Sequence, residues 1–445
     1  MAMSNNNVKS NNSSKVPANR LSRFGSLASL AGRVAGGMLA EGARQLAKGN
    51  IPDKKDMLLT PGNAKRVADQ LAHLRGAAMK VGQLLSMDAG DMLPPALADM
   101  LARLRSSANP MPVKQLAQVL KTEWGDNWQR HFSDFTFAPL AAASIGQVHQ
   151  AYHDNGKRLA VKIQYPGVKD SIDSDIDNVA TLLRISGLVP KGVDYQQLLA
   201  EAKLQLKSEA DYLQEAAYLL QYRQFLVTNP HFLIPEVVMD LTTANILVMS
   251  YVEGVPIEAL AERSQVERDR VMSLLFELLF RELFEFKLVQ TDPNFANYQY
   301  NTTTQQLVLL DFGACRQYSD SFSQGYRQLF YAALQQDQTA MVAALTAIGF
   351  FSQAILPAQQ QAVLNVVQLA CEPLQQNSAF DFGQSDLALR LREAGTALSM
   401  QQNYWHSPPA DAIFLHRKMG GLYLLAARLK ARVNLRTLLQ PYLPA

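Results

Sequence analysis

The sequence has few cysteines, little excess charge and no long apolar run. Two cysteines among 445 residues argue against a disulfide framework or a structural zinc site and fit a reducing compartment. The 42 basic and 39 acidic residues leave a net charge of +3, which is too small to favour nucleic acid as a partner. Because no stretch is long and apolar enough to span a bilayer, we expect a soluble or peripheral protein.

The beginning of the chain lacks acidic residues, and the first one is Glu41. Residues 1–20 are rich in Asn, Ser and Lys and too poor in apolar groups to offset the entropy of ordering, so we predict a disordered tail. Three interpretations stay open for this basic start: a flexible tail, a membrane-surface segment or a transit-like presequence. Residues 24–47 are rich in Gly, Ala and Leu, with interruptions such as Arg33 and Arg44. They indicate either a small-residue helix packed on its own domain or shallow membrane association.

The length and apolar content of the chain set its domain organisation. A hydrophobic share of 48% is typical of an ordered globular protein. A chain of 445 residues exceeds what one core usually supports, so we expect one large bilobal domain or two domains.

The strongest chemical signal lies between Gln290 and Arg316. Asp292 is followed five residues later by Asn297, and Asp311 opens an Asp-Phe-Gly tripeptide after an apolar run. A nucleoside triphosphate is held with a divalent metal, and hard cations take oxygen ligands from carboxylates and amide carbonyls. Asp-Phe-Gly alone fits a strand end followed by a glycine turn equally well. Its pairing with Asp-x-x-x-x-Asn matches the catalytic loop and metal site of protein kinases.

An upstream hairpin supplies a candidate phosphate-binding lysine. Residues 137–167 predict two strands joined by a turn at 154–156, and Lys162 lies in the second strand within Val-Lys-Ile. A lysine at this place suits the neutralisation of α- and β-phosphate charge. The alternative is an exposed lysine on an alternating surface, and the downstream Asp and Asn motifs favour the functional interpretation.

The loop before this hairpin is rich in alanine where a kinase carries a glycine-rich turn. Alanine methyl groups restrict the φ > 0 conformations that glycine allows, so we predict a stiffer loop that changes nucleotide selectivity or slows transfer. The residues of this loop that we assign to nucleotide binding are Ala141, Ala142, Ala143, Ser144 and Gly146.

Two helical regions carry further polar candidates. Residues 62–120 look helical and include Lys80, which taken alone is a solvated lysine on an amphipathic helix. A long helix predicted over 195–224 carries Glu209, Asp211 and Glu215. One carboxylate on this helix could pair with the hairpin lysine, and the alternative is that all of them are solvated.

The strand predicted at 245–253 resembles the strand and hinge between kinase lobes. Backbone groups of Met249 and Tyr251 are our candidates for hydrogen bonds to adenine. Residues 264–288 have apolar positions at helical spacing and support the loop that carries Asp292. We predict that the chain after Tyr318 is mostly helical.

These residues resemble the UbiB/aarF-domain-containing family of atypical kinases, close to its coenzyme Q biosynthesis branch. The resemblance covers roughly residue 15 to the C-terminus and includes a Lys-x-Gly-Gln motif and an alanine-rich nucleotide loop. Its most specific segments are 80–83, 141–149, 160–168, 209–212 with Glu215, 290–294, 311–314 and 417–421.

The resemblance implies an α+β, protein-kinase-like bilobal fold with an N-terminal helical extension and a helical C-terminal lobe. The domains that follow are a disordered tail at 1–20, a small-residue segment with possible membrane contact at 21–50, a helical extension at 51–136, an N-lobe with a helical insert at 137–253 and a C-lobe at 254–445.

The resemblance also implies ATP or ADP and Mg²⁺ as ligands. Lys162 would contact the phosphates and pair with Glu215, and Asp292 would take the catalytic-loop position. Asn297 and Asp311 would hold Mg²⁺. A family-specific lid and its partners, which hinder access by protein substrates, would consist of Lys80, Gln83, Glu209 and Asp211.

Some features depart from kinase and family patterns. Asp292 lacks the preceding His-Arg of ordinary kinases, and no Ala-Pro-Glu segment follows Asp311. Residues 294–296 are Asn-Phe-Ala, nearer to the mitochondrial pattern than to the His-Pro-Gly of many bacterial relatives, whereas the Asn-rich start lacks the arginines of a strong transit peptide. We expect a cytoplasmic protein at the bacterial inner membrane, with the matrix side of the mitochondrial inner membrane as the alternative.

The expected function is a Mg²⁺-dependent ATPase that supports ubiquinone biosynthesis at a membrane. The alternatives are a small-molecule or lipid kinase with the same site, and a nucleotide-binding scaffold for other biosynthetic enzymes. Expected partners are an anionic membrane surface, quinone precursor lipids, other quinone biosynthesis proteins and a second copy in a homodimer, but no nucleic acid.

Overall fold

The structure is a computed structural model that describes residues 36, 44, 45, 77, 80, 81, 110–186, 195–351, 355–401 and 409–444. The chain divides into two compact units. Unit 1 comprises Met1–Gln214 and Val237–Tyr251, and unit 2 comprises Glu215–Glu236 and Val252–Ala445.

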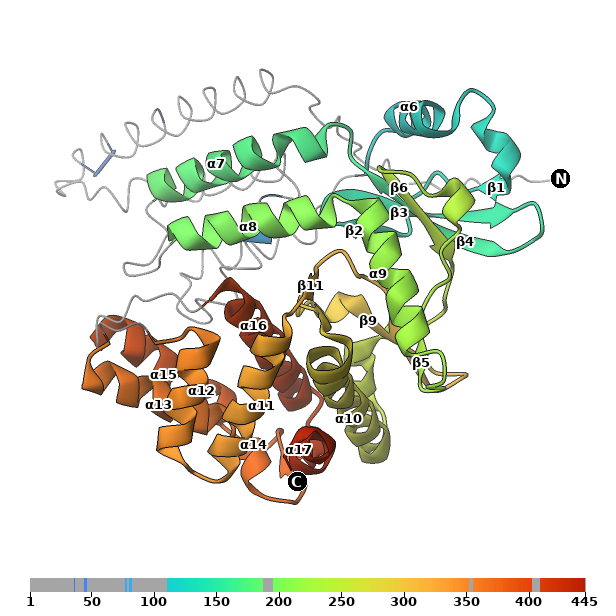
Figure 1. Ribbon diagram of the computed structural model, residues 1–445. Coiled ribbons are helices and arrows are strands. Elements are labelled where there is room, and N and C mark those ends of the chain that lie inside the picture. Colours follow the sequence, from blue (N-terminus) through green and yellow to red (C-terminus); the bar gives the residue numbers. More distant parts are fainter. Residues whose placement is uncertain are drawn as a thin grey trace. The chain divides into compact units, whose positions relative to one another are not determined.

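Unit 1 is built on a five-stranded antiparallel sheet (Figure 1). Strands β1, β3, β4 and β6 lie in this order, and β2 pairs with β3. The predicted strands on both sides of the turn at 154–156 and the strand predicted at 245–253 are confirmed. The strand bounds are β1 Phe132–Phe135, β2 Ala141–Ala143, β3 Gly146–His153, β4 Arg158–Gln164 and β6 Ile246–Ser250.

The apolar core of unit 1 lies between this sheet and helix α6 (Val113–Trp124). Leu116 and Leu120 of the helix are fully buried in the same cluster as Val161 and Ile163 of β4. Since side chains alternate along a strand, the residue between these two, Lys162, lies on the opposite face of β4. Two short 3₁₀ turns complete this part, η2 Trp128–His131 and η3 Met239–Leu241.

The helical segment after β4 differs from the prediction. Helix α7 (Val168–Ser186) lies beside α8 (Tyr195–Glu209), but the long helix predicted over 195–224 is wrong (Figure 1). Helix α8 ends at Glu209, and α9 (Tyr212–Phe225) begins after two intervening residues. A side chain from β4 stabilises the break, because Gln164 Nε2 donates to Ala210 O at 2.9 Å.

Unit 2 combines small sheets with many helices. Strands β5 (Phe232–Leu233), β10, β9 and β7 form a four-stranded sheet, β8 pairs with β11, and β12 pairs with β13. The remaining strands are β7 Val255–Pro256, β8 Leu288–Gln290, β9 Tyr298–Asn301, β10 Gln306–Leu309, β11 Cys315–Gln317, β12 Phe380–Asp381 and β13 Arg432–Val433.

The helix predicted over 264–288 is confirmed in its main part. Helix α10 (Gln265–Arg281) is capped at its N-terminus by Ser264, whose side chain accepts a hydrogen bond from Glu267 N. The helix continues as a π-helical turn, η5 (Glu282–Phe286). The turn ends at Lys287, whose φ of 52° lies in the left-handed region. The chain then enters β8 and the segment that carries Asp292.

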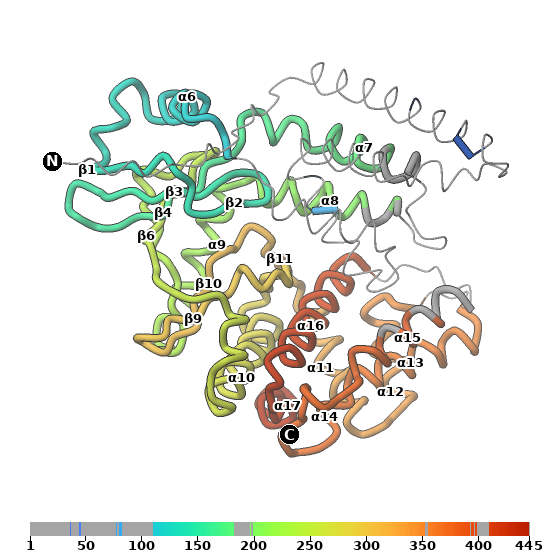
Figure 2. The backbone as a smooth tube through the Cα atoms, turned by 180° about the vertical axis from the view of Figure 1, so that it is seen from behind, coloured from blue at the N-terminus to red at the C-terminus, as the bar shows by residue number. Residues whose placement is uncertain are grey.

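The prediction that the chain after Tyr318 is mostly helical is confirmed, and helix α16 lies between α10 and α11 (Figure 2). The other helices and turns of unit 2 are η4 Ile257–Glu262, η6 Phe295–Asn297, α11 Asp320–Leu334, α12 Gln338–Ile348, α13 Pro357–Ala370, α14 Glu372–Gln375, α15 Leu387–Gln401, α16 Ala410–Arg428, α17 Leu435–Leu439 and η7 Gln440–Tyr442.

Candidate functional site

The alanine-rich segment is partly a strand and not a free loop as expected. Ala141–Ala143 form β2, which pairs with the start of β3, so that only Ser144 and Ile145 form the turn. A Cβ atom on Gly146 would overlap the carbonyl oxygen of Ile163 on β4. Glycine is therefore required at position 146, because two strands approach closely there. The pairing of β2 with β3 restricts the alanine-rich segment in addition to the alanine methyl groups.

Lys162 is almost buried in unit 1, with 7% of its surface exposed. It pairs with Val148 on one side and Leu247 on the other, within the sheet. Its Nζ lies 5.1 Å from the centroid of the Tyr212 ring. The side chain is therefore almost buried on the face of β4 opposite the apolar core, and its phosphate-binding role stays a prediction.

Glu209 joins two motifs that lie far apart in the sequence. Its carboxylate lies 2.5 Å from Lys80 Nζ and accepts a hydrogen bond of 2.5 Å from Ser144 Oγ. All of the lysine and most of the glutamate are buried, with exposed fractions of 1% and 7%. The interpretation of Lys80 as a solvated lysine is therefore wrong, and Glu209 ties Lys80 to the alanine-rich hairpin.

The other lid candidates have different positions. Asp211 accepts a hydrogen bond of 3.1 Å from Gln214 N and so caps the start of α9. Glu209 and Asp211 therefore lie at the break between α8 and α9 and not within one long helix. Gln83 and residues 21–50 other than Gly36, Arg44 and Gln45 lie outside the described residues.

The hinge candidates are held by their own unit. Met249 pairs with Ala160 of β4 and also forms a bridge with Val237. The Tyr251 N–H donates to Arg158 O at 2.9 Å, and the Arg158 guanidinium lies 3.6 Å from the centroid of the Tyr251 ring. Because this amide is already used, the carbonyl oxygen of Tyr251 is the group that stays as a candidate for adenine.

In unit 2 the segment after β8 brings Asp292 and Asn297 together. Asn297 Nδ2 donates to Asp292 O at 3.4 Å, and Asp292 Oδ1 accepts from Asn294 N at 3.3 Å. Thr291 fixes the start of the segment, because its N–H and its hydroxyl both donate to Ala314 O, at 3.1 and 2.6 Å. We call residues 290–298 the Asp292 loop.

The Asp-Phe-Gly tripeptide follows β10 and is linked to the Asp292 loop. Leu310 N donates to Asn297 O at 3.1 Å, so the residue before Asp311 is bonded to the second predicted metal ligand. Asp311 Oδ1 accepts from Gly313 N at 3.0 Å, while Phe312 is buried and its ring centroid lies 4.7 Å from that of Tyr222. The structure thus brings Asp292, Asn297 and Asp311 onto two hydrogen-bonded segments.

The donor set of these segments suits Mg²⁺. The Asn297 amide turns its nitrogen to Asp292 O, which leaves the carbonyl oxygen directed elsewhere, and Asp311 adds a carboxylate. Oxygen donors of this kind are the ligands that Mg²⁺ prefers. No cluster of three or more His, Cys, Asp or Glu side chains with metal-ligand spacing occurs among the described residues, so one amide and one carboxylate are the candidates.

Glu215 lies in the first turn of α9 and is 1% exposed. Its burial excludes the interpretation as a solvated helix carboxylate. Its pairing with Lys162 stays a prediction, as do the roles of the lid and of the two hinge residues.

The sequence analysis assigned no role to a group of buried polar side chains in unit 2. They form hydrogen bonds or ion pairs with one another, and a signal was present in the sequence, because two of them are charged residues inside apolar helical runs. The members are Tyr222, Glu282, Gln290, Tyr298 and Lys418.

His416 of α16 is a buried histidine with a hydrogen-bond partner. The ring is buried and its Nε2 lies 2.8 Å from the Tyr326 hydroxyl, while Phe350 stacks on it with ring centroids 5.5 Å apart. Burial lowers the pKa of His416 from 6.5 to about 4, so the imidazole is neutral at pH 7.

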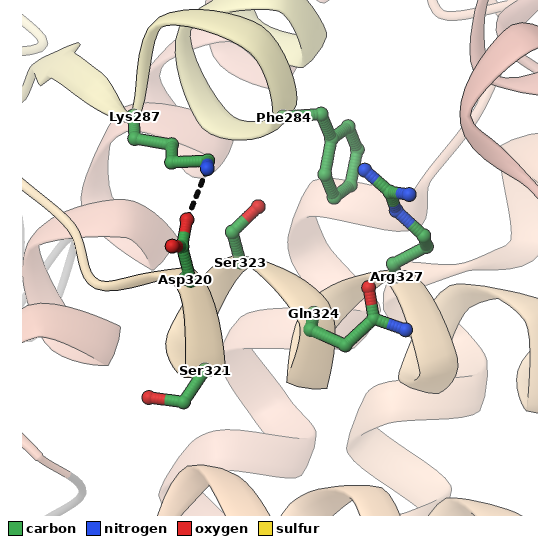
Figure 3. A pocket seen from close by; sticks show the side chains of 7 residues that line it. All are labelled: Phe284, Lys287, Asp320, Ser321, Ser323, Gln324 and Arg327. Carbon is green, nitrogen blue, oxygen red and sulfur yellow. Dashed lines mark hydrogen bonds and ion pairs between the residues drawn. The ribbon is translucent and has the colours of Figure 1, made fainter.

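A surface pocket of unit 2 lies at the start of α11 (Figure 3). Lys287 and Asp320 form an ion pair at its edge, and the guanidinium of Arg327 lies 5.5 Å from the centroid of the Phe284 ring. Phe284, Lys287, Asp320, Ser321, Ser323, Gln324 and Arg327 line the pocket, and none of them is a predicted site residue.

Over the part of the chain that the structure describes, no helix combines the length and the apolar character that crossing a membrane requires.

The comparisons with known proteins agree on one family and one fold. The model of the ABC1 atypical kinase-like domain matches residues 103–345. The atypical kinase COQ8, mitochondrial, of Saccharomyces cerevisiae is 38% identical over 424 residues, which cover 95% of this chain and 84% of that protein. The atypical kinase COQ8B, mitochondrial, of Rattus norvegicus is 36% identical over 428 residues, which cover 96% and 81%.

Among solved structures, the complex of Rv3197 with erythromycin from Mycobacterium tuberculosis matches with a TM-score of 0.58 and 24% identity. The match covers 85% of this chain and 96% of that chain. The family model and this structure confirm the predicted kinase-like α+β fold.

Proposed function

Because the chain belongs to the ABC1 atypical kinase-like family, we propose that it binds ATP and hydrolyses it with Mg²⁺, in support of ubiquinone biosynthesis at a membrane. The observation that carries this proposal is the pair of hydrogen-bonded segments that present Asp292, Asn297 and Asp311. Phosphoryl transfer needs little covalent help from a protein, and depends on positioning and charge stabilisation.

Each of these three side chains has a proposed role. Asn297 and Asp311 would hold Mg²⁺, which would supply positive charge to neutralise the phosphates. Asp292 accepts a hydrogen bond from the attacking water and takes its proton as the bond from oxygen to the γ-phosphorus forms and ADP leaves. The hydrogen bonds around these residues fix their spacing before any ligand arrives.

In our proposal, unit 1 contributes the lysine that contacts the phosphates and the lid motif that restricts access by protein substrates. Lys162 neutralises phosphate charge. Glu209 joins Lys80, the lysine of the Lys-x-Gly-Gln motif, to Ser144 in the turn that we assign to the nucleotide. A lid motif held in this way favours water over a protein hydroxyl as the acceptor, which is why we propose an ATPase and not a protein kinase.

The link to ubiquinone follows from the relatives, whose names identify mitochondrial atypical kinases of the COQ8 type. We propose that the substrates presented by ATP turnover are quinone precursor lipids at an anionic membrane surface, with other quinone biosynthesis proteins as partners. Peripheral binding at the bacterial inner membrane, or at the matrix side of the mitochondrial inner membrane, fits this role.

The test is ATP turnover by the wild type and by Asp311→Asn, with and without anionic liposomes and phenolic quinone precursors. We expect phosphate release by the wild type and a loss of about 100-fold or more in the variant, because a preorganised charge at the phosphates is removed. A matched control exists in Asp381→Asn, since Asp381 opens a second Asp-Phe-Gly tripeptide and accepts from Gly383 N at 2.9 Å.

Other results would identify the competing functions. Label on a lipid or phenol would indicate a small-molecule or lipid kinase. Nucleotide binding without turnover in any variant would indicate a scaffold and contradict the proposed ATPase.

A further inference from the structure

Lys418 of α16 contacts both ends of the Asp292 loop. Its Nζ lies 3.2 Å from Gln290 Oε1 and 2.5 Å from the Tyr298 hydroxyl. Gln290 stands two residues before Asp292, and Tyr298 directly follows Asn297. One ammonium group therefore bonds to the residues that begin and end the loop.

The charge of Lys418 is kept in spite of its burial. Only 1% of the residue is exposed, and burial by itself counts against the ammonium, but the Glu282 carboxylate and Tyr298 outweigh this and raise the pKa of Lys418. Glu282 Oε2 lies 3.7 Å from Nζ. Burial raises the pKa of Glu282, while Lys418 and the Tyr222 hydroxyl oppose that increase. A buried ion pair contributes little net stability. A role in positioning the Asp292 loop therefore explains the buried Lys418 and Glu282 better than a role in stability does.

Glu282 extends this network to the helix that carries Glu215. The Tyr222 hydroxyl of α9 donates to Glu282 Oε1 at 2.8 Å and also lies 2.9 Å from Leu288 O. The Tyr222 ring contacts Phe312 of the Asp-Phe-Gly tripeptide. The carboxylate is thus bonded from α9 on one side and faces Lys418 on the other.

A second contact of α16 reaches the loop one helical turn further on. A Cβ atom on Gly421 would lie 2.5 Å from Pro293 Cβ, so the helix backbone packs directly against the residue after Asp292. Lys418 and Gly421 are three residues apart and share a face of the helix. The neighbouring Gly420 has open space at the same place, with nothing within 4 Å of an added Cβ.

We propose that Lys418 is a positioning residue that fixes the Asp292 loop, with Glu282 as its counter-ion and Gly421 as the contact surface. Ordinary kinases place His-Arg directly before the catalytic aspartate. Here Gln290 and Thr291 stand at those positions, and the cation comes from α16. The catalytic consequence rests on the proposed function, whereas the ordering of the loop does not.

The mildest test removes one hydroxyl. Tyr298→Phe deletes the shortest contact of Lys418, and Tyr326→Phe is a matched control, because it also deletes a buried hydroxyl of unit 2 but one that faces His416. We expect Tyr298→Phe to increase amide hydrogen exchange in residues 290–298 at least about 10-fold and to lower kcat about 10-fold with little change in the KM for ATP. The control should change neither quantity more than about twofold.

Two further pairs of variants distinguish a positioning role in the Asp292 loop from an effect on the overall stability of the protein. Lys418→Arg keeps the charge and several donors and should retain more loop protection than Lys418→Met. Gly421→Ala should lower kcat and raise exchange in the loop, whereas Gly420→Ala should do neither.

Equal exchange in residues 290–298 for Tyr298→Phe and Tyr326→Phe, or equal effects of the two glycine variants, would overturn the proposal. Loop exchange that responds as expected in a protein without ATP turnover would support the positioning role and contradict only the ATPase.

Discussion

The chain contains the tripeptide Asp-Phe-Gly twice, at 311–313 and at 381–383, and both copies lie in unit 2. The two copies share one local hydrogen bond, because each aspartate accepts from the glycine two residues later, at 3.0 and 2.9 Å. Each phenylalanine is buried, with exposed fractions of 1% and 3%. The tripeptide therefore specifies a turn and a buried ring in both places.

The neighbours of the two copies differ. The residue before Asp311 is bonded to Asn297 in the Asp292 loop, whereas Phe382 N donates to Ala431 O in a short two-stranded ladder. The ring of Phe382 packs against Phe276 and Tyr423, and neither of these residues is a predicted metal ligand. The comparison teaches that the nearby oxygen groups, and not the tripeptide, make the first copy a candidate metal site.

The largest effect should come from the buried rings. Phe312→Ala and Phe382→Ala each remove a buried aromatic side chain, and each should lower the free energy of unfolding by about 3–5 kcal/mol. Urea unfolding of the two variants measures this cost. Only Phe312→Ala should also reduce the turnover of the folded protein, because only that ring packs on Tyr222, next to the Asp292 loop. Equal turnover losses would contradict the division of roles.

Acid should lower the stability of the protein through α16, the helix that packs against the Asp292 loop and against Phe382 of the second tripeptide. Helix α16 places Gly421 against Pro293 and Tyr423 against Phe382, and it carries the buried His416. The pKa of His416 is lowered to about 4 in the folded protein, so its contribution is fully present above pH 6.5 and is lost as pH falls towards 4. The difference between a pKa of 6.5 in the unfolded chain and about 4 in the folded protein lowers the free energy of unfolding by about 3 kcal/mol between pH 7 and pH 4.

The measurement is urea unfolding between pH 7.5 and 4.5 for the wild type and for His416→Gln, which keeps a polar side chain opposite Tyr326. The variant should show a shallower loss of stability across this range. An identical pH dependence of the two proteins would show that the titration of His416 does not contribute.

The smallest effect concerns the metal alone. Asp311→Asn should weaken the apparent affinity for Mg²⁺ in the presence of ATP about 10- to 100-fold, because a carboxylate ligand becomes a neutral amide. Asp381→Asn should leave the affinity unchanged. Calorimetric titration of Mg²⁺ into each nucleotide-saturated variant distinguishes the two copies, and a similar loss in both would remove the distinction.

Much of the fold and part of the site could be predicted from local patterns. The apolar run around Lys162 predicted β4, the turn residues before it predicted the hairpin, and the apolar spacing over 264–288 predicted α10. The break between α8 and α9 could not be read from the sequence, because residues 195–224 have good helix formers throughout. The break is stabilised by Gln164, which is 46 residues from the carbonyl oxygen that it bonds.

The sequence by itself determined the chemical groups: the hairpin lysine, the Asp-x-x-x-x-Asn spacing and the Asp-Phe-Gly turn, since these depend on neighbours in the chain. Only the tertiary structure decided which groups are buried together. It joined Lys80 to Glu209 and Ser144, and it brought Lys418 to both ends of the Asp292 loop from 120 and 128 residues away. The physical reason is that a buried charge requires a partner, and the partner comes from whichever segment packs beside it, however distant it is in the sequence.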